Sequence, residues 1–358
     1  MQYMSKACPA GNISLIAGPC ALEDEGQTME MACKISLVKK AVEPFGIAVG
    51  YRGGAWKPRT RPEDGNGNGV FEGVGETGLK WLGKIGNMYG MPIVTECMSE
   101  QDLRHFGRYL EPARDFIQIG ARNSQNFALL YFIGGTPFNV LLKSPQHGVD
   151  VEEAAGSIMR LKKNGTVAYC VRGQKYFMPP DGLEDDYFRR YMEKLFSSPD
   201  QCRGSRNLNN ISDIRKLRKD QYLSGKGVLF AYDPSHTFGG ADDRLRRMIG
   251  KQAVKAVMDY GYDMVEVEVN DRSSRARCDA NQALLSTTRN VDWSETNAGQ
   301  GPKIEPGGGS EPSVKPFTLV DIAKELVKYR NLKLGLPGEK LETAMWELDS
   351  ISWDIKPG

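Results

Sequence analysis

The stretch FIQIGARNSQNFALLYF, residues 116–132, decides the fold class, because it holds one complete repeat of a pattern that runs through the chain. Residues 116–120 are a short apolar run, which predicts a buried strand, and residues 123–133 have helical periodicity. Arg122 stands between them, where the strand ends. A strand followed by a helix in this way is typical of a parallel sheet with helical crossovers.

The same alternation recurs on both sides of this repeat. Strands are predicted at residues 14–19, 47–52, 92–97, 116–120, 139–144, 166–173, 228–234 and 264–269. Helices are predicted at residues 28–43, 75–89, 99–108, 123–133, 150–163, 209–219, 242–260 and 274–287. Eight such units over about 280 residues fit a closed barrel better than an open doubly wound sheet. We therefore predict an α/β fold, the (β/α)8 TIM barrel.

Two segments fall outside the repeat and set the predicted domains. Residues 174–205 extend the loop after the sixth strand, and a loop of this length is typically a lid, a binding loop or an oligomer contact. Residues 294–315 are rich in Gly, Pro, Ser and Glu, which predicts a flexible linker. We expect a catalytic barrel at 1–293 and, after the linker, a C-terminal helical tail at 316–358 that serves in packing or oligomer contact.

Composition narrows the class of protein. Among 358 residues, 47 are basic and 45 acidic, and a net charge of +2 argues against a nucleic-acid or polybasic membrane surface. The first residues lack the features of a secretory signal, and no apolar run is long enough to span a bilayer. Seven cysteines without a CxxC spacing indicate neither a disulfide framework nor a zinc ribbon. We expect a cytoplasmic enzyme with no nucleic-acid or membrane partner.

Reactive side chains follow the predicted strands at their carboxyl ends, where barrels of this kind build their sites. In chain order they are Cys20, Arg52, Lys57, Glu96, Arg122, Lys143, Arg172, His236 and Glu268, with Asp279 just beyond the last strand. Because all eight units deliver such a group to one rim, we predict a functional site there.

Four of these residues are candidate metal ligands, namely Cys20, His236, Glu268 and Asp279. A thiolate, an imidazole and two carboxylates suit a borderline divalent metal such as Mn, Fe, Co, Zn or Cu, with a position left open for substrate. Each residue alone could be a buried small side chain, a turn residue or an inward polar group. Their coincidence at strand ends favours the metal site.

A second set is cationic and includes the stretch GGAWKPRTRP, residues 53–62, with Lys57, Arg59 and Arg61. By itself this stretch is typical of a solvated loop. The full set is Arg52, Lys57, Arg59, Arg122, Lys143 and Arg172. Guanidinium and ammonium groups that converge in a cleft suit phosphate and carboxylate groups, and burying them together without anions would be destabilising. We predict small, multiply charged anions as ligands.

The ordered motifs carry a resemblance. They are AGPCALE (17–23), KPRT (57–60), VTEC (94–97), GARNSQNFALL (120–130), VLLK (140–143), CVRG (170–173), RNLNNIS (206–212), DPSHTFGG (233–240), EVN (268–270) and CDANQALL (278–285). The chain resembles the class I 3-deoxy-D-arabino-heptulosonate 7-phosphate (DAHP) synthases, in the superfamily shared with 3-deoxy-D-manno-octulosonate 8-phosphate synthases. The resemblance implies a metal-dependent transferase of the shikimate route to aromatic amino acids. It would condense phosphoenolpyruvate with an aldose phosphate, classically D-erythrose 4-phosphate, and release inorganic phosphate.

The resemblance also implies residue roles. It makes Cys20, His236, Glu268 and Asp279 the ligands of a divalent Mn, Fe, Co or Zn ion. It places Arg52, Lys57 and Lys143 at the carboxylate and reacting carbon of phosphoenolpyruvate, Arg122 and Arg172 at its phosphate, and Arg59 with Thr60 at the phosphate of the aldehyde. Arg61 and Glu96 complete the substrate-binding set, and Lys57, Cys20 and His236 are the expected catalytic residues. A homo-oligomer, dimer or tetramer, is expected from the resemblance alone.

Several positions depart from the family pattern on the acceptor side. Arg61 replaces a small hydroxyl residue, and Asn210 and Asn270 replace an aspartate and a histidine. Three interpretations stay open. The chain is an ordinary synthase, a homologue that uses a larger or more anionic aldehyde in secondary metabolism, or a catalytically silent barrel with a regulatory or assembly role.

Overall fold

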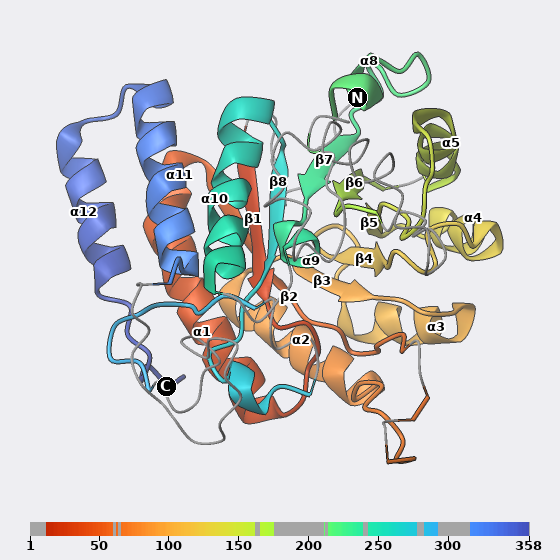
Figure 1. Ribbon diagram of the computed structural model, residues 1–358, viewed down its shortest axis with the longest axis horizontal. Coiled ribbons are helices and arrows are strands. Elements are labelled where there is room, and N and C mark those ends of the chain that lie inside the picture. The colour runs from red at the N-terminus through yellow and green to blue at the C-terminus, as the bar shows by residue number, and fades with distance from the viewer. Residues whose placement is uncertain are drawn as a thin grey trace, which may run out of the picture.

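Eight parallel strands close into a barrel in which each strand pairs with its neighbours in chain order and β1 also pairs with β8 (Figure 1). The computed structural model describes residues 12–59, 62–63, 66–161, 165–174, 211, 214–238, 243–277, 283–292 and 316–357. The strands are β1 Ile13–Gly18, β2 Ile47–Arg52, β3 Ile93–Glu96, β4 Phe116–Ile119, β5 Asn139–Lys143, β6 Val167–Val171, β7 Leu229–Tyr232 and β8 Met264–Glu268. The predicted (β/α)8 barrel is confirmed, with each strand near its predicted place.

The inward faces of the strands change from apolar to charged along their length. Ile16, Val94, Leu141 and Met264 belong to one small buried cluster that is separate from the main core. Side chains alternate between the two faces of a strand, so Lys143 shares the face of Leu141, and Glu266 and Glu268 share the face of Met264. The interior is therefore apolar at one end and charged at the carboxyl ends of the strands.

Helices follow the strands, and the longer ones bury their apolar faces against the outside of the barrel. They are α1 Glu25–Val42, α2 Glu76–Tyr89, α3 Glu100–Tyr109, α4 Phe127–Gly134, α5 Val151–Leu161, α8 Ile214–Lys219, α9 Pro234–Thr237 and α10 Asp243–Tyr260. Side-chain caps fix the starts of some of them: Asp24 accepts from the backbone of Gln27 at 2.7 Å, and Ser99 forms a capping box with Asp102. Among the described residues, no helix is long and apolar enough to cross a membrane.

The helix predicted at 274–287 is wrong for the residues that the structure describes there. Ser273–Arg275 is a single 3-10 turn, and Leu284 instead forms a parallel bridge with Val269, just beyond β8. Leu284 is buried by this pairing, which explains why its apolar character suggested a helix face. The backbone of Asn270 donates to Leu284 at 2.9 Å, so the segment extends the sheet.

A later helix takes the place beside α10. Helix α11, Leu319–Leu334, packs against both α10 and α1, and α12, Gly338–Asp349, packs against α1 and α11 (Figure 1). Leu319, Ile322 and Leu326 are fully buried in the main core. The segment predicted as a tail therefore shares the hydrophobic core of the barrel. The loop predicted after Gln174 and the linker predicted at 294–315 lie outside the described residues.

A buried ion pair anchors the segment after β8. Lys34 Nζ on α1 lies 2.8 Å from Asp271 Oδ2 and 5.0 Å from the ring centre of Trp353. Asp271 also accepts hydrogen bonds from the backbone and hydroxyl of Ser286, both at 2.7 Å. One lysine thus connects α1, the chain after β8 and the C-terminal segment.

Candidate functional site

The carboxyl ends of the strands hold six charged or titratable side chains that contact one another in a ring. They are Arg52, Lys143, Asp233, His236, Glu266 and Glu268. The first is Arg52. Its Nη1 atom lies 2.9 Å from Glu268 Oε1, and its Nε atom lies 3.2 Å from Glu266 Oε1. The first contact is a hydrogen bond, whereas Glu266 Oε1 accepts no hydrogen bond within the described part of the chain and is held by charge. Arg52 at the end of β2 therefore lies between two carboxylates of β8.

Lys143, at the end of β5, continues the ring. Its Nζ atom lies 2.7 Å from Glu266 Oε2 and 2.5 Å from Asp233 Oδ2. The two carboxylates are fully buried, and the lysine side chain is only 3% exposed. A buried ammonium between two carboxylates is stable only because both partners compensate its lost hydration.

His236 closes the ring through the turn DPSH. Its Nδ1 atom lies 2.6 Å from Asp233 Oδ2, and its Nε2 atom lies 3.7 Å from Glu268 Oε1. The carboxylate of Asp233 also accepts from the backbone of His236 at 3.2 Å, as the N-cap of α9. Because an ionised carboxylate can only accept, the Nδ1 atom carries a proton, and the Nε2 atom is left facing Glu268.

Protonation of the ring follows from its charges. Burial alone would raise the pKa of Asp233, but His236 and Lys143 outweigh it and hold this pKa well below its usual value. Burial would lower the pKa of Lys143, but Asp233, Cys170 and Glu266 raise it above its usual value. Burial likewise opposes Arg52, whose pKa is raised by Glu266 and Glu268. These three groups are therefore ionised at neutral pH.

Two of the four predicted metal ligands lie close together. Two ligands of one tetrahedral ion are about 3.4 Å apart when each bond is about 2.1 Å, and His236 Nε2 and Glu268 Oε1 are 3.7 Å apart. Cys20 is buried after β1, but among the described residues its thiol does not lie within 4.8 Å of both His236 and Glu268. Two of the predicted ligands, His236 and Glu268, are therefore at the separation that a metal requires, and Cys20 is not. The fourth predicted ligand, Asp279, lies outside the described residues.

A second group of possible ligands is less suitable. The ligand atoms of Cys170, Asp233 and Glu266 lie within 4.8 Å of one another. However, Lys143 Nζ contacts both carboxylates, so its positive charge already compensates part of their negative charge. Burial raises the pKa of the Cys170 thiol well above its usual value, which disfavours the thiolate that a metal requires.

Lys57 and Glu96 form a pair beside the ring. Lys57 Nζ lies 3.8 Å from Glu96 Oε2, and both side chains are largely buried. Glycine is required next to each of them: a Cβ atom on Gly120 would lie 1.8 Å from Glu96 Oε1, and one on Gly54 would lie 2.7 Å from Lys57 Cδ. The absence of side chains at these two positions leaves room for the pair.

The other predicted residues lie farther out or beyond the described chain. Arg172 is buried after β6, and Arg122 is exposed after β4. Arg59 donates to the carbonyl groups of Phe71 and Arg277 at 2.8 and 3.0 Å. Thr60 and Arg61 fall outside the described residues.

Sequence reasoning missed two members of the ring, Asp233 and Glu266. Both had a signal. Glu266 is two residues before Glu268 on the same strand, so the alternation of faces points it inward as well. Asp233 directly precedes Pro234 at a strand end, which is the pattern of a capped helix start.

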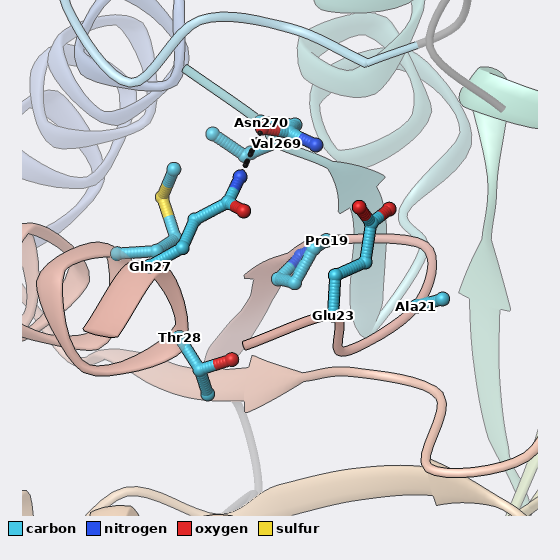
Figure 2. A pocket seen from close by; sticks show the side chains of 8 residues that line it. Pro19, Ala21, Glu23, Gln27, Thr28, Val269 and Asn270 are labelled. Carbon is cyan, nitrogen blue, oxygen red and sulfur yellow. Dashed lines mark hydrogen bonds between the residues drawn. The ribbon is translucent and has the colours of Figure 1, made fainter. Parts of the chain in front are cut away.

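A small pocket lies between the chain after β1, the first turns of α1 and the chain after β8 (Figure 2). Its lining comprises Pro19, Ala21, Glu23, Gln27, Thr28, Met31, Val269 and Asn270. Gln27 Nε2 donates to Asn270 Oδ1 at 2.9 Å, as the dashed line in Figure 2 marks. This bond occupies the side chain that stands where the family pattern has a histidine.

Comparison with known proteins agrees with the barrel and its motifs. The model of the DAHP synthetase I family matches residues 9–298. The chain belongs to the DAHP synthetase I family. The phospho-2-dehydro-3-deoxyheptonate aldolase of Thermotoga maritima is 33% identical over 276 residues, which cover 76% of this chain and 66% of the relative. A 2-dehydro-3-deoxyphosphooctonate aldolase of Rickettsia typhi is 26% identical over 74% of this chain and 83% of its own length.

Solved structures of DAHP synthases are similar as well. The crystal structure of the Thermotoga maritima DAHP synthase has a TM-score of 0.58 and 31% identity, covering 78% of this chain and 66% of that one. A truncated form of the Thermotoga maritima 3-deoxy-D-arabino-heptulosonate 7-phosphate synthase has a TM-score of 0.55 and 28% identity, covering 78% and 82%. The chain thus spans slightly less than two thirds of the full-length Thermotoga relative.

Proposed function

We propose that this protein is a metal-dependent synthase that condenses phosphoenolpyruvate with an aldose phosphate, D-erythrose 4-phosphate in the first place. The products are DAHP and inorganic phosphate. The observation that carries this proposal is the charge of the ring. Glu266, Glu268 and Asp233 are three carboxylates that face two cations, Arg52 and Lys143, so apart from the imidazole the ring has a net charge of −1.

A divalent ion held by Cys20, His236 and Glu268 would compensate this charge and supply a Lewis acid for the aldehyde oxygen. Asp279 is the proposed fourth ligand. The link from Asp233 to His236 keeps the imidazole in the tautomer that a metal requires. Membership of the family supports the metal site, and the donor types suit Mn, Fe, Co or Zn.

The cations of the site are proposed to hold the substrates. Arg52 and Lys143 would orient the carboxylate and reacting carbon of phosphoenolpyruvate, and Arg122 and Arg172 its phosphate. Arg59, Thr60 and Arg61 would take the phosphate of the aldehyde. Preformed positive charge that fixes two anionic substrates in register supplies most of what such a condensation needs.

The reaction balances with the residues in these roles. The C3 carbon of phosphoenolpyruvate forms a bond to the aldehyde carbon, water adds to C2, and the C2–O bond to phosphate breaks. The alkoxide formed from the aldehyde takes a proton, for which Lys57 is the proposed donor. Its neighbour Glu96, 3.8 Å from Lys57 Nζ, would keep the ammonium charged until that step.

The test is turnover by the purified full chain with manganese. We expect phosphate release that requires both phosphoenolpyruvate and D-erythrose 4-phosphate, with formation of a seven-carbon 2-keto acid phosphate detected by mass spectrometry. Chelation should abolish turnover and added metal should restore it. Absence of product with every metal and aldehyde tried, together with no bound transition metal, would instead support a silent barrel.

The same chemistry on a different aldehyde is the second candidate, because Arg61 and Asn270 change the acceptor side of the family pattern. A panel of aldehyde phosphates of three to six carbons decides between the two candidate functions by kcat/KM.

A homo-oligomer, dimer or tetramer, and a cytoplasmic location belong to the same proposal. Light scattering of the purified protein tests the oligomeric state.

A further inference from the structure

Arginines crowd the segment after β8, and one of them is fixed at the mouth of the barrel. Arg272, Arg275 and Arg277 fall within six residues. Arg272 pairs with Glu30 on α1 at 3.0 Å. The guanidinium carbon of Arg277 instead lies 4.5 Å from the ring centre of Phe71, in the loop after β2. A stack of this kind fixes the plane of a guanidinium group.

Three loops meet around this stack. Arg59 donates through Nε to the carbonyl of Phe71 at 2.8 Å and through Nη2 to the carbonyl of Arg277 at 3.0 Å. The backbone of Arg277 donates to Glu23 Oε1, after β1, at 2.8 Å. The loops after β1, β2 and β8 are therefore joined at one point.

This point borders the proposed site. Phe71 packs against Cys20 and Ala21, so the ring that carries the Arg277 guanidinium also covers a proposed metal ligand. The backbone carbonyl of Phe71 accepts from Arg59, which is proposed to hold the phosphate of the aldehyde. Arg277 therefore contacts both Phe71, which packs against Cys20, and Arg59.

The hydrogen-bond donors at this point favour an anion. Burial raises the pKa of Glu23, and the charges of Arg277 and Arg59 act against this rise. Two guanidinium groups, those of Arg59 and Arg277, thus lie beside Glu23, together with the second carboxylate of Asp24. Arg59 has five N–H donors and spends two on the carbonyl groups, so it retains donors for a ligand. A stacked guanidinium keeps its edge for bidentate bonds to a phosphate.

We propose that Arg277 is a specificity-determining residue that binds the distal phosphate of the aldehyde acceptor together with Arg59. This inference rests on the proposed function. It assigns to the loop after β8 a substrate contact in addition to its metal ligand, and it explains why an arginine at this position is stacked on Phe71.

The test compares the Arg277→Gln variant with a matched Arg275→Gln variant, which removes a charge from the same loop at an exposed 3-10 turn. For Arg277→Gln we expect the KM for D-erythrose 4-phosphate to rise about 10- to 100-fold, as for a lost bond to a charged group. The KM for phosphoenolpyruvate and the low activity with unphosphorylated erythrose should not change. Arg275→Gln should behave as wild type. An equal loss with phosphorylated and unphosphorylated aldehydes would make Arg277 a structural brace and overturn the inference.

A binding experiment tests this inference independently of the proposed reaction. Calorimetry with erythritol 4-phosphate, which lacks the reactive aldehyde, measures acceptor binding to the metal-loaded protein without turnover. Binding that weakens in Arg277→Gln but not in Arg275→Gln supports the inference even if the wild-type protein catalyses nothing, in which case only the proposed function fails. Wild-type protein that does not bind this compound, or an Arg277→Gln variant that binds it equally well, overturns the inference.

Discussion

The Nδ1 atom of His236 lies 2.6 Å from Asp233 Oδ2, and the same carboxylate caps the short helix on which His236 stands. One aspartate therefore fixes both the backbone and the ring of the proposed metal ligand. The same oxygen also lies 2.5 Å from Lys143 Nζ, so the histidine and the lysine of the proposed phosphoenolpyruvate site are held by a single atom. The proposed metal site and the proposed anion site therefore cannot change their geometry independently.

Replacement of Asp233 by asparagine should weaken metal binding. An amide can turn its NH2 group to the imidazole and no longer holds a proton on Nδ1, so the Nε2 lone pair is lost for part of the molecules. We expect metal affinity to fall about 10- to 100-fold, the usual effect of removing such a partner. Titration with manganese or zinc, followed by calorimetry, measures it. Asp150→Asn, at the exposed start of α5, is the control and should bind metal as wild type.

Glu266 should be essential for stability. It is fully buried between Arg52 and Lys143, and Glu266→Gln leaves both cations with less compensation. Breaking a buried pair typically costs about 3–5 kcal/mol, so we expect a loss of this size in the free energy of unfolding. Urea unfolding measures it. Glu25→Gln removes a partner of Lys84 from a pair that is about half exposed and should cost less than about 1 kcal/mol. Equal losses in the two variants would contradict the buried ring.

The sequence was sufficient for the barrel and for much of the site, because both depend on local patterns. A strand with a reactive residue at its end places that residue on the rim, so Arg52, Lys143, His236 and Glu268 could be expected to meet. The alternation of faces also directs Glu266 to the side of Glu268, a signal that the prediction overlooked. The ion pairs within the ring could not be expected, because they depend on the register between strands that are far apart in the sequence.

The helix expected after β8 failed for a related reason. Apolar residues such as Leu284 and Leu285 look alike in a helix and in an extended segment that pairs with a strand end. Tertiary contacts favour the extended segment over the helix, namely the bridge from Leu284 to Val269 and the packing of α11 beside α10. Both contacts join residues that no local window contains together.

Gly120 should not tolerate a side chain. A Cβ atom there would overlap Glu96 Oε1 at 1.8 Å, so Gly120→Ala must displace the partner of Lys57. We expect a destabilisation of about 1–3 kcal/mol. We also expect a lower kcat, because the proposed proton donor loses its neighbour. The control is Gly107→Ala within α3, where a Cβ atom meets nothing within 4 Å. It should stabilise by about 0.5–1 kcal/mol, as alanine does in a helix. Thermal unfolding and steady-state kinetics distinguish the two variants.

Glu76, at the start of α2, should make stability depend on pH. A hydrogen bond from Tyr109 at 2.9 Å, together with the His105 ring whose Nδ1 atom lies 3.0 Å from Glu76 Oε2, holds the pKa of this carboxyl below its usual value of 4.5. A group whose pKa is lowered by folding stabilises the protein above its unfolded pKa, and this contribution disappears as the pH falls through the folded pKa. Wild type should therefore exceed Glu76→Gln in unfolding free energy at pH 6, and the difference should shrink steadily as the pH is lowered below 4.5. Urea unfolding of both proteins across this range measures it, with Glu342→Gln on α12 as an exposed control. A difference that stays constant from pH 6 to pH 3 would show that the hydrogen bonds do not discriminate between the ionised and the protonated carboxyl.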